Sequence, residues 1–454
     1  MVDVVIYKFQ PDAMDKEILE RLFVGESRRK LIEKLANEIK EAAKSGTPRY
    51  YLIVEPRGVG KTHFITLLYY KIKNFGEILP VKLSEEEFSI YRVSDLFLRI
   101  METLGKIDFD WETLEDDEII VAVLNDLKST GKMIVIFMEN LNQILGEQMG
   151  EKEVKKLRSI LQRENIFTIV ATAPLIFPQI SKHEEPFFNF FKIIYLPELT
   201  RDELNELIRR VAEIENNKEF LTRIDEIERK IESVRILTKG SPRIAILLYD
   251  LMSKGKLIDV EKAFFKLLDE NTPYYQDVFR SLSAEKRKIF DTLIALGKPA
   301  TPKEIARKAR LNEKIVNTQL RRLEKDGYVI SHKVGRFTKY EVRERLFRLW
   351  RELRREPFGR KRLSILIEFL ELWYSKEERL KRFLECLKDL QDEIKIREAS
   401  YRFLSLPHKD KEALLPEIVQ KACEFGDFRV VDEIISEEFK AEGRKCQDDI
   451  FLYN

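Results

Sequence analysis

Hydrophobic positions in the first part of the chain predict strands that alternate with helices. Short apolar runs bounded by Gly, Pro or charged residues are typical of buried strands, whereas apolar positions spaced three and four apart are typical of amphipathic helices. Strands are predicted at 50–54, 79–83, 132–138, 167–172 and 191–196, and helices at 26–44, 62–73 and 94–104. Because the run at 132–138 is almost continuously apolar, we expect a parallel sheet covered on both faces.

After residue 199 the strand pattern is lost and the spacing of apolar residues predicts only helices. These helices are expected at 201–215, 218–238, 242–253 and 259–268. The pattern changes again at 280–345, where three predicted helices precede two short β runs, and residues 360–454 are predicted to be helical throughout. We therefore expect four domains, at 1–198, 199–277, 278–358 and 359–454.

The segment EPRGVGKT joins a predicted strand to a predicted helix and resembles a phosphate-binding loop. Gly58 and Gly60 let the backbone turn its N–H groups inward, where they and the helix N-terminus bind a β-phosphate. Lys61 reaches the β and γ oxygens, and the Thr62 hydroxyl is a ligand for Mg²⁺. Glu55 replaces the first Gly of the usual pattern. The candidate nucleotide-binding residues of this loop are Pro56, Arg57, Gly58, Val59, Gly60, Lys61, Thr62 and His63.

The apolar strand predicted at 132–138 runs into the sequence MENLN, which makes its end a candidate metal site. In the register that we prefer, Glu139 binds Mg²⁺ and Asn140 takes the place where a carboxylate would polarise the attacking water. In the other register, Glu139 polarises the water and Met138 replaces the metal ligand. One of two acids is missing in either register. Because an amide cannot accept a proton, hydrolysis is expected to be slow or absent.

Two further residues are placed to act on a γ-phosphate. Thr172 ends the strand predicted at 167–172, and a hydroxyl there can hydrogen-bond the phosphate or its water; a strand-terminal Thr without function is the alternative. The motif GSPR opens the helix predicted at 242–253. Its Ser and Pro are ordinary residues for a helix start. Arg243 is not needed for that start, and we predict that it reaches the γ-phosphate.

Together these motifs resemble those of AAA+/STAND-type P-loop ATPases with a C-terminal winged helix, near the archaeal ATPase and origin-recognition initiator branches. The segment FVG, the loop EPRGVGKT, the strand end MENLN and the motif GSPR carry the resemblance. It implies that Val24 and Gly25 line the adenine pocket, and that ATP and Mg²⁺ are the cofactors. Residues 181–200 contain no Arg, where initiators have an arginine finger, so the chain looks more like a STAND switch than a motor.

The fold class implied by this resemblance is α/β. It consists of a P-loop NTPase parallel sheet with a helical lid, a winged-helix domain and an all-helical C-terminal tail.

The charge distribution adds a second candidate site. The whole chain has a net charge of +2, which argues against a uniformly basic surface, but residues 280–360 carry 23 basic and 10 acidic residues. Within this segment the pattern predicts a helix-turn-helix at 301–309 and 313–326. It also predicts a β-hairpin at 327–342, which completes the pattern of a winged helix. Packing or protein contact is the alternative role. The candidate DNA-binding residues are Lys314, Asn317, Thr318, Arg321, Arg322, Lys333, Arg336 and Lys339.

We interpret the sequence as a nucleotide-dependent switch that binds ATP or ADP and hydrolyses ATP slowly. Double-stranded DNA is the expected partner of the winged helix, and a protein partner is expected for the C-terminal helices. Two alternatives stay open: an initiator-like ATPase that loads or remodels proteins on DNA, and a signalling scaffold whose winged helix binds protein. An oligomer is compatible with either.

Several classes of protein are disfavoured by the same sequence. Its three Cys and four His are scattered, which argues against a Cys/His metal centre. No apolar run approaches the ~20 residues of a membrane span. We therefore expect a cytoplasmic protein with no membrane partner.

Overall fold

The computed structural model describes the chain in two compact units. The described residues are 11, 14–55, 58–85, 87–106, 111–222, 224, 230–233, 235–236, 240–253, 268–269, 272–335, 337–355, 371, 373–387, 402–403 and 405–425. The first unit comprises Met1–Asp225 and Val234–Arg345, and the second comprises Glu226–Ser233 and Leu346–Asn454. The four domains expected from the sequence divide the chain more finely and stay predictions.

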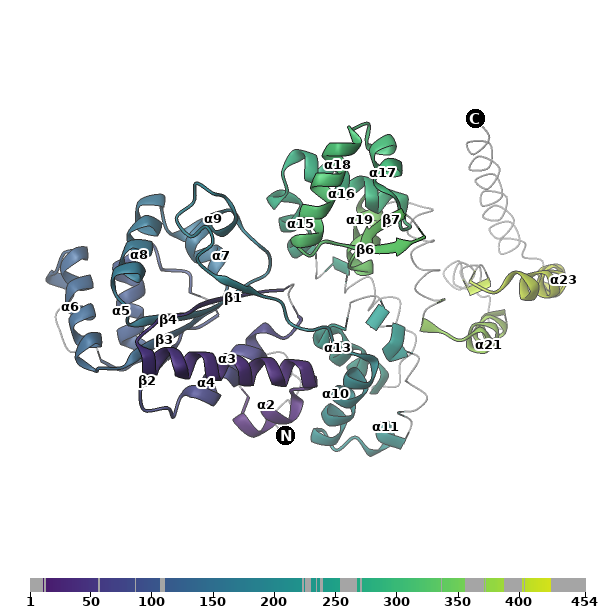
Figure 1. The fold of residues 1–454 in the computed structure, drawn as a ribbon. Helices are drawn as coiled ribbons and strands as arrows, with labels where there is room; N and C mark the ends of the chain where they lie inside the picture. Colours follow the sequence, from purple (N-terminus) through teal and green to yellow (C-terminus); the bar gives the residue numbers. More distant parts are fainter. Residues whose placement is uncertain are drawn as a thin grey trace. The chain divides into compact units, whose positions relative to one another are not determined.

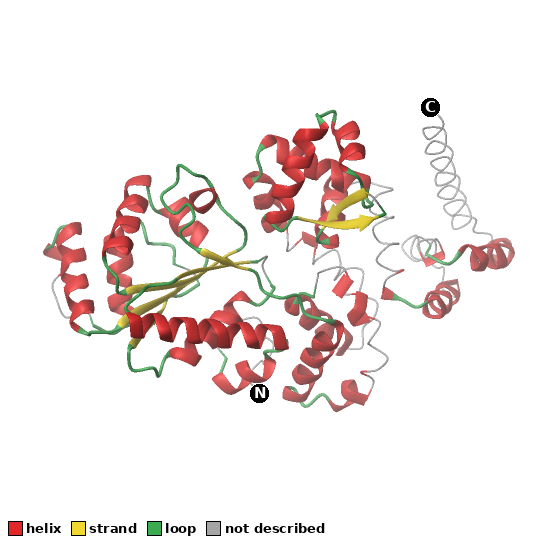
Figure 2. Cartoon of the chain, viewed as in Figure 1, coloured by secondary structure: helices red, strands yellow, loops and turns green. Residues whose placement is uncertain are grey.

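A five-stranded parallel sheet forms the centre of the first unit (Figures 1 and 2). Its strands are β1 (Tyr50–Val54), β2 (Ile78–Lys82), β3 (Met133–Met138), β4 (Phe167–Ala173) and β5 (Lys192–Ile194). Every residue of β3 and β4 is buried, as expected for strands covered on both faces. The predicted parallel sheet is confirmed. β5 is shorter than the predicted strand at 191–196 because only three of its residues pair with β1.

The strand order β2-β3-β4-β1-β5 brings the motifs together. β4 lies between β1 and β3, with Thr172 beside Ile53 and Ala171 beside Met138. The carboxyl ends of these three parallel strands therefore meet at one edge of the sheet. In open α/β sheets, ligands bind in the crevice outside this edge.

Helices cover both faces of the sheet (Figure 1). Their bounds are α2 (Lys16–Leu22), α3 (Glu26–Ser45), α4 (Lys61–Ile72), α5 (Val93–Thr103), η2 (Trp111–Thr113), α6 (Asp116–Ser129), α7 (Leu141–Gln143), η3 (Ile144–Gln148), α8 (Glu151–Arg163) and α9 (Pro178–Ser181). α3 and α4 lie on one face, and α5 and α8 lie on the other. The pattern of apolar residues predicts α3, α4 and α5 to within one residue at each end, but assigns no separate helix to α2, α6 or α8.

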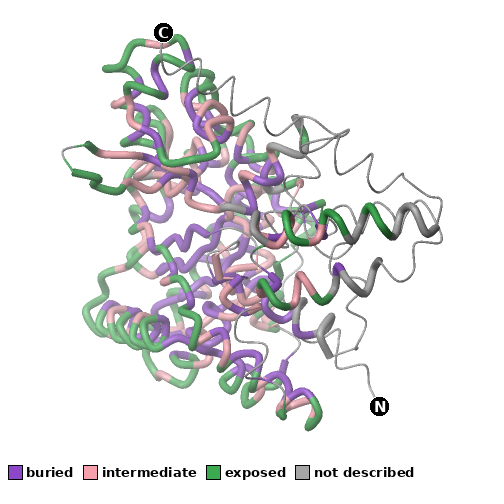
Figure 3. The backbone as a smooth tube through the Cα atoms, turned by 90° about the vertical axis from the view of Figure 1, so that its right-hand side faces the viewer, coloured by how far each residue is buried: buried purple, intermediate pink, exposed green. Residues whose placement is uncertain are grey.

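The buried stripe of α3 differs from the predicted one by one position. Ile32, Leu35 and Ile39 are buried as the spacing requires, but Leu31 is only half-buried. The stripe continues instead to Arg28, which is 3% exposed. Buried and exposed positions alternate along the outer helices in Figure 3, as amphipathic helices require.

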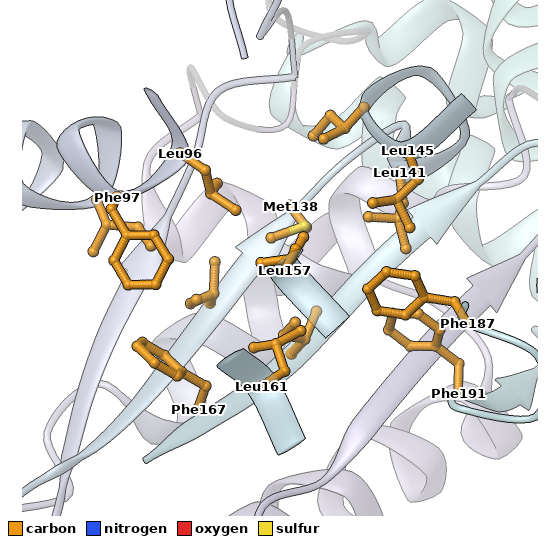
Figure 4. A pocket seen from close by; sticks show the side chains of 14 residues that line it. Leu96, Phe97, Met138, Leu141, Leu145, Leu157, Leu161, Phe167, Phe187 and Phe191 are labelled. Atoms are coloured by element: carbon orange, nitrogen blue, oxygen red, sulfur yellow. The ribbon is translucent and has the colours of Figure 1, made fainter. Parts of the chain in front are cut away.

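An apolar void of about 10 Å³ lies between the sheet and the helices α5, α7 and α8 (Figure 4). Leu96, Met138, Leu157 and Phe187 are among its lining residues, all of which are hydrophobic in the described part of the chain. A void of this size holds at most about one water, which would find no polar partner there. We therefore regard it as part of the packed core.

The helices after residue 199 begin with α10 (Arg201–Ile214), whose first turn is capped by the Thr200 hydroxyl and Glu203. α10 packs on α13 (Pro242–Ser253). The bounds of the others are α11 (Lys218–Thr222) and α15 (Thr272–Ser281). Most of the predicted helices 218–238 and 259–268 lies outside the described residues.

Residues 284–342 form three helices and an antiparallel hairpin. The elements are α16 (Ala284–Leu296), α17 (Pro302–Ala309), α18 (Glu313–Lys325), β6 (Val329–Val334) and β7 (Phe337–Val342). The predicted core residues Ile305, Val316, Leu320 and Leu323 are all fully buried. Ala300 pairs with Tyr340 of β7, which ties the loop before α17 to the hairpin.

The second unit contains α19 (Arg345–Arg355) from Leu346 onward, α21 (Lys376–Leu387) and α23 (His408–Phe425). Leu346, Leu349 and Trp350 form a buried face of α19. Phe383 packs on Phe403 with their ring centroids 5.4 Å apart. Much of the predicted helical tail at 359–454 lies outside the described residues. None of the helices in the described part of the chain is long and apolar enough to cross a membrane.

Candidate nucleotide-binding site

The loop between β1 and α4 has the backbone of an anion-binding turn. Gly58 and Gly60 have φ angles of 83° and 97°, which residues with a side chain rarely adopt. Lys61, the first residue of α4, is 8% exposed and donates from Nζ to the Glu55 carbonyl oxygen at 2.8 Å. The predicted residues Pro56 and Arg57 lie outside the described part of the chain.

Thr62 and Glu139 bring two side-chain oxygen atoms together beside this loop. The Thr62 hydroxyl donates to Glu139 Oε2 at 2.6 Å, and Glu139 is 4% exposed. Hydroxyl and carboxylate oxygens are the donors that Mg²⁺ prefers. The two residues therefore fit a divalent cation at the end of β3.

The side chains of Met138 and Glu139 lie on opposite faces of the sheet. Successive residues of a strand point to opposite faces. Met138 lines the apolar void on the α5–α8 side of the sheet (Figure 4), whereas Glu139 contacts Thr62 of α4. The carboxylate at 139, and not the thioether at 138, thus lies next to the loop.

Thr172 and Asn140 lie next to each other at the ends of neighbouring strands. The Asn140 backbone N–H donates to the Thr172 hydroxyl at 3.4 Å, and Thr172 is fully buried. Asn140 has a φ angle of 51°, a left-handed conformation in which Asn is enriched. Its side-chain amide donates to the Glu85 carbonyl oxygen at 3.4 Å. The two predicted residues are thus neighbours at the carboxyl ends of β3 and β4.

The motif GSPR binds directly to the phosphate loop. The Ser241 hydroxyl and the Arg243 backbone N–H both donate to the Gly58 carbonyl oxygen, at 3.1 and 3.3 Å. A Cβ atom on Gly58 would lie 3.1 Å from the Arg243 side chain. Arg243 therefore lies against the loop, and its contact with a γ-phosphate stays a prediction. The interpretation of Ser241 as a helix-start residue did not predict its hydrogen bond to the loop.

The segment FVG packs against the residues that precede α10. Leu199 lies between Gly25 and Gly240, since a Cβ atom on Gly25 would be 3.0 Å from its side chain and one on Gly240 would be 2.4 Å from its carbonyl oxygen. Val24 beside Gly25 is buried. The proposed adenine-pocket residues thus lie against the linker that leads into α10.

His63 packs against α2 and the residue that follows it. Its Nε2 donates to the Leu19 carbonyl oxygen at 2.7 Å, and its ring packs on Phe23 with centroids 5.1 Å apart. Burial lowers the pKa of His63 to about 4, so the ring is neutral at pH 7. Its described contacts join α4 to α2.

Glu55 links the base of the loop to the end of β5. Its carboxylate accepts a hydrogen bond from the Leu196 N–H at 3.0 Å and is 6% exposed. Burial raises the pKa of Glu55 to about 7, and the nearby cations Arg343, Lys61 and Arg28 limit the rise. The acid that replaces the usual Gly therefore has a structural contact of its own.

Arg28 is the main residue of the site that sequence reasoning missed. Its Nε donates to the Pro197 carbonyl oxygen at 2.7 Å, and its Nη1 donates to the Val59 carbonyl oxygen at 2.8 Å. Burial lowers the pKa of Arg28 to about 10, which leaves it charged at neutral pH. A signal was available, because Arg28 lies four residues before Ile32 on the buried stripe of α3.

The candidate DNA-binding residues lie on α18 and the hairpin. Lys314, Thr318, Arg321, Arg322 and Lys333 are exposed, and Asn317 and Lys339 are half-exposed. The side chains of Asn317 and Thr318 bond the backbone of their own helix, to the carbonyl oxygens of Glu313 and Lys314. Arg321 lies against the Tyr340 hydroxyl, where it offsets part of the rise that burial causes in the pKa of Tyr340. Arg336 lies outside the described residues.

The fold and this loop define a P-loop NTPase domain. Residues 28–244, just under half of the chain, match the model of the KAP family P-loop domain. The Aeropyrum pernix ORC2 protein, solved as ADPNP–ADP complexes, has the same fold with a TM-score of 0.50 at 13% identity, over 72% of this chain and 93% of that one. The domain thus has a P-loop NTPase fold like that of the Aeropyrum pernix ORC2 protein.

Two further proteins are similar over much of their length. An uncharacterized HTH-type transcriptional regulator of Methanocaldococcus jannaschii is 21% identical over 349 residues, which cover 68% of this chain and 84% of the relative. The Walker-type ATPase of Pyrococcus abyssi matches with a TM-score of 0.48 at 15% identity, over 70% of this chain and 95% of that one.

The close approach of Gly240 to Leu199 gives a test of this part of the site. We expect Gly240→Ala to lower the free energy of unfolding by about 3 kcal/mol or more, of which about 1–2 kcal/mol is the cost of a left-handed non-Gly residue. The remainder comes from the clash with the Leu199 carbonyl oxygen. Gly46→Ala is the matched control, because Gly46 also has a positive φ angle, 64°, but a Cβ atom there would have no described atom within 4 Å. Equal losses in urea denaturation of the two variants would rule out the clash.

Proposed function

We propose that the protein binds ATP with Mg²⁺ at this site and acts as a slow nucleotide-dependent switch. The observation that carries the proposal is the Thr62–Glu139 hydrogen bond of 2.6 Å beside a loop with two left-handed glycines. Bound Mg²⁺ would neutralise charge on the phosphates. Calorimetric titration with ATP tests this proposal, once in the presence of Mg²⁺ and once in EDTA. We expect saturable binding of ATP that Mg²⁺ strengthens, and the absence of saturable binding would refute the site.

Each residue of the site has a proposed role. The N–H groups of the loop and Lys61 bind the β- and γ-phosphates. Thr62 and Glu139 hold the cation, and Thr172 and Asn140 orient water at the γ-phosphate. Arg243 contributes a positive charge from α13, so nucleotide binding and the position of the proposed lid helices are coupled through Gly58.

The second proposed activity is binding of double-stranded DNA through residues 284–342, which we interpret as a winged helix. Three helices followed by a hairpin, with exposed cations on α18 and β6, support this interpretation. The name of the Methanocaldococcus jannaschii relative, an HTH-type regulator, agrees with it. Nucleotide and DNA binding in one chain suggest a cytoplasmic switch whose DNA contact depends on the nucleotide.

A charge reversal on α18 tests DNA binding. We expect Arg322→Glu to weaken binding of a random duplex and to flatten the plot of log K against log salt by about 1, the contribution of one phosphate contact. Arg322 is preferred to Arg321, which lies against Tyr340. Lys288→Glu on α16 is the control, since Lys288 is exposed on a helix that does not enter the groove in this interpretation. Equal salt slopes for both variants and the wild type would exclude the α18 surface.

One observation favours a scaffold that binds protein as the second candidate. Val334 and Phe337, beside the hairpin turn, are 52% and 55% exposed. Exposed apolar side chains at a hairpin tip suit a protein interface as well as a DNA groove. Absence of duplex binding by the wild type at low salt would favour this candidate over a DNA-binding switch or an initiator-like ATPase. The STAND assignment rests on the lack of Arg at 181–200.

A further inference from the structure

We propose that Arg28 positions the phosphate loop for anion binding, a proposal that rests on the nucleotide site proposed above. Arg28 is 3% exposed and joins two segments that are far apart in the sequence. Its guanidinium donates to the Val59 carbonyl oxygen in the loop and to the Pro197 carbonyl oxygen in the linker between β5 and α10. The loop is thereby fixed to the linker by a single planar group.

These hydrogen bonds control the direction of the loop N–H groups. No described peptide bond is cis, and in a trans peptide the carbonyl and the following N–H point in opposite directions. Arg28 holds the Val59 carbonyl, while Ser241 and Arg243 hold the Gly58 carbonyl. The N–H groups of Val59 and Gly60 must then point to the opposite side. Two neighbouring N–H groups that converge in this way form an anion-binding concavity.

The buried charge of Arg28 supplies a second argument. Among the described residues no acceptor pairs with its Nη2, although this nitrogen is buried. A buried donor without a partner is costly, and such groups in native proteins call for an explanation. Positioning of the loop is such an explanation, because it requires the guanidinium to be buried against both carbonyl groups. Glu55, Glu198 and Glu203 keep the guanidinium charged without hydrogen-bonding it.

Lysine at this position separates charge from geometry. Arg28→Lys keeps the positive charge near Glu55, but an ammonium cannot reproduce the planar fork that bonds both carbonyl groups. Arg29→Lys is the matched control, because Arg29 is the next residue of α3, is exposed, and bonds the Glu20 and Phe23 carbonyl oxygens instead of the loop.

The experiment measures binding of ADP, tripolyphosphate and AMP to the full chain by calorimetry, with thermal unfolding of each variant as a check on folding. For Arg28→Lys we expect about a tenfold loss of affinity for ADP and for tripolyphosphate, the effect of one lost hydrogen bond to a charged group. AMP, which has no β-phosphate, should lose much less. Arg29→Lys should bind all three like the wild type.

Three results would overturn the proposal. Unchanged affinity for ADP and tripolyphosphate in folded Arg28→Lys would show that the loop is positioned without Arg28. An equal loss for AMP, ADP and tripolyphosphate would indicate a general disturbance of the site. If the wild type itself does not bind ADP and tripolyphosphate, the nucleotide site is refuted, and this inference with it. The wild-type titration distinguishes this result from the first two.

Discussion

Replacing Lys61 with Ala is expected to weaken ATP binding by about a hundredfold or more. In the proposed site, Lys61 donates charge-assisted hydrogen bonds to two phosphate groups, each worth about 1.5–3 kcal/mol. Lys61 is the first residue of α4 and is 8% exposed, so its ammonium is well shielded from water. Shielding strengthens its attraction to phosphate relative to that of a surface Lys.

The fold should survive this substitution. The substitution removes the hydrogen bond from Lys61 to the Glu55 carbonyl oxygen, and a single hydrogen bond contributes about 0.5–1.5 kcal/mol to the free energy of unfolding. Lys71→Ala is the control, since Lys71 is exposed on the same helix and forms an ion pair with Glu33 at the surface. Calorimetry with Mg²⁺ and ATP gives the affinities and thermal unfolding monitors the fold. Wild-type affinity in folded Lys61→Ala would refute the phosphate loop.

ATP turnover by the isolated protein is expected to stay below about 1 s⁻¹, the bottom of the usual enzyme range. Two features lead to this expectation. Asn140 follows Glu139 where a carboxylate would accept a proton from water, and residues 181–200 supply no Arg to stabilise charge on the phosphoryl group. An arginine finger alone contributes about 10³–10⁵ in rate.

Introducing the missing carboxylate should therefore raise turnover. A positioned general base contributes about 10²–10⁴ in rate, so we expect an increase of about 10²-fold for Asn140→Glu. Asn140→Asp is its companion, because Asn and Asp both tolerate the left-handed backbone found at φ 51°. The initial rate of phosphate release measures both variants.

Glu139→Gln distinguishes the two registers of the strand end. If Glu139 holds the cation with Thr62, this variant should lose the Mg²⁺-dependent part of its ATP affinity, measured as the difference between titrations in Mg²⁺ and in EDTA. Fast wild-type turnover that Glu139→Gln abolishes with affinity intact would support the other register, in which Glu139 polarises water.

Local sequence determined much of the nucleotide-binding half of the chain. The apolar runs of β1, β3 and β4 predict strands because a doubly covered strand needs no polar face. The loop EPRGVGKT predicts its own conformation because Gly58 and Gly60 are the residues that adopt positive φ easily. The four buried residues of α17 and α18 that are predicted as core follow from helical spacing alone. These are properties of short segments, and neighbouring residues in the chain are enough to reveal them.

The strand order and the surroundings of Arg28 required the tertiary structure. Nothing in the local pattern states that β4 lies between β1 and β3, which puts Thr172 beside Asn140. An Arg on the stripe of α3 looks like an exposed residue until the loop and the linker supply the Val59 and Pro197 carbonyl oxygens that allow its burial. Ser241 likewise fits a helix start, and only packing of α13 on the loop reveals its bond to Gly58. Contacts of this kind join residues 31 to 183 positions apart, so only the folded chain decides them.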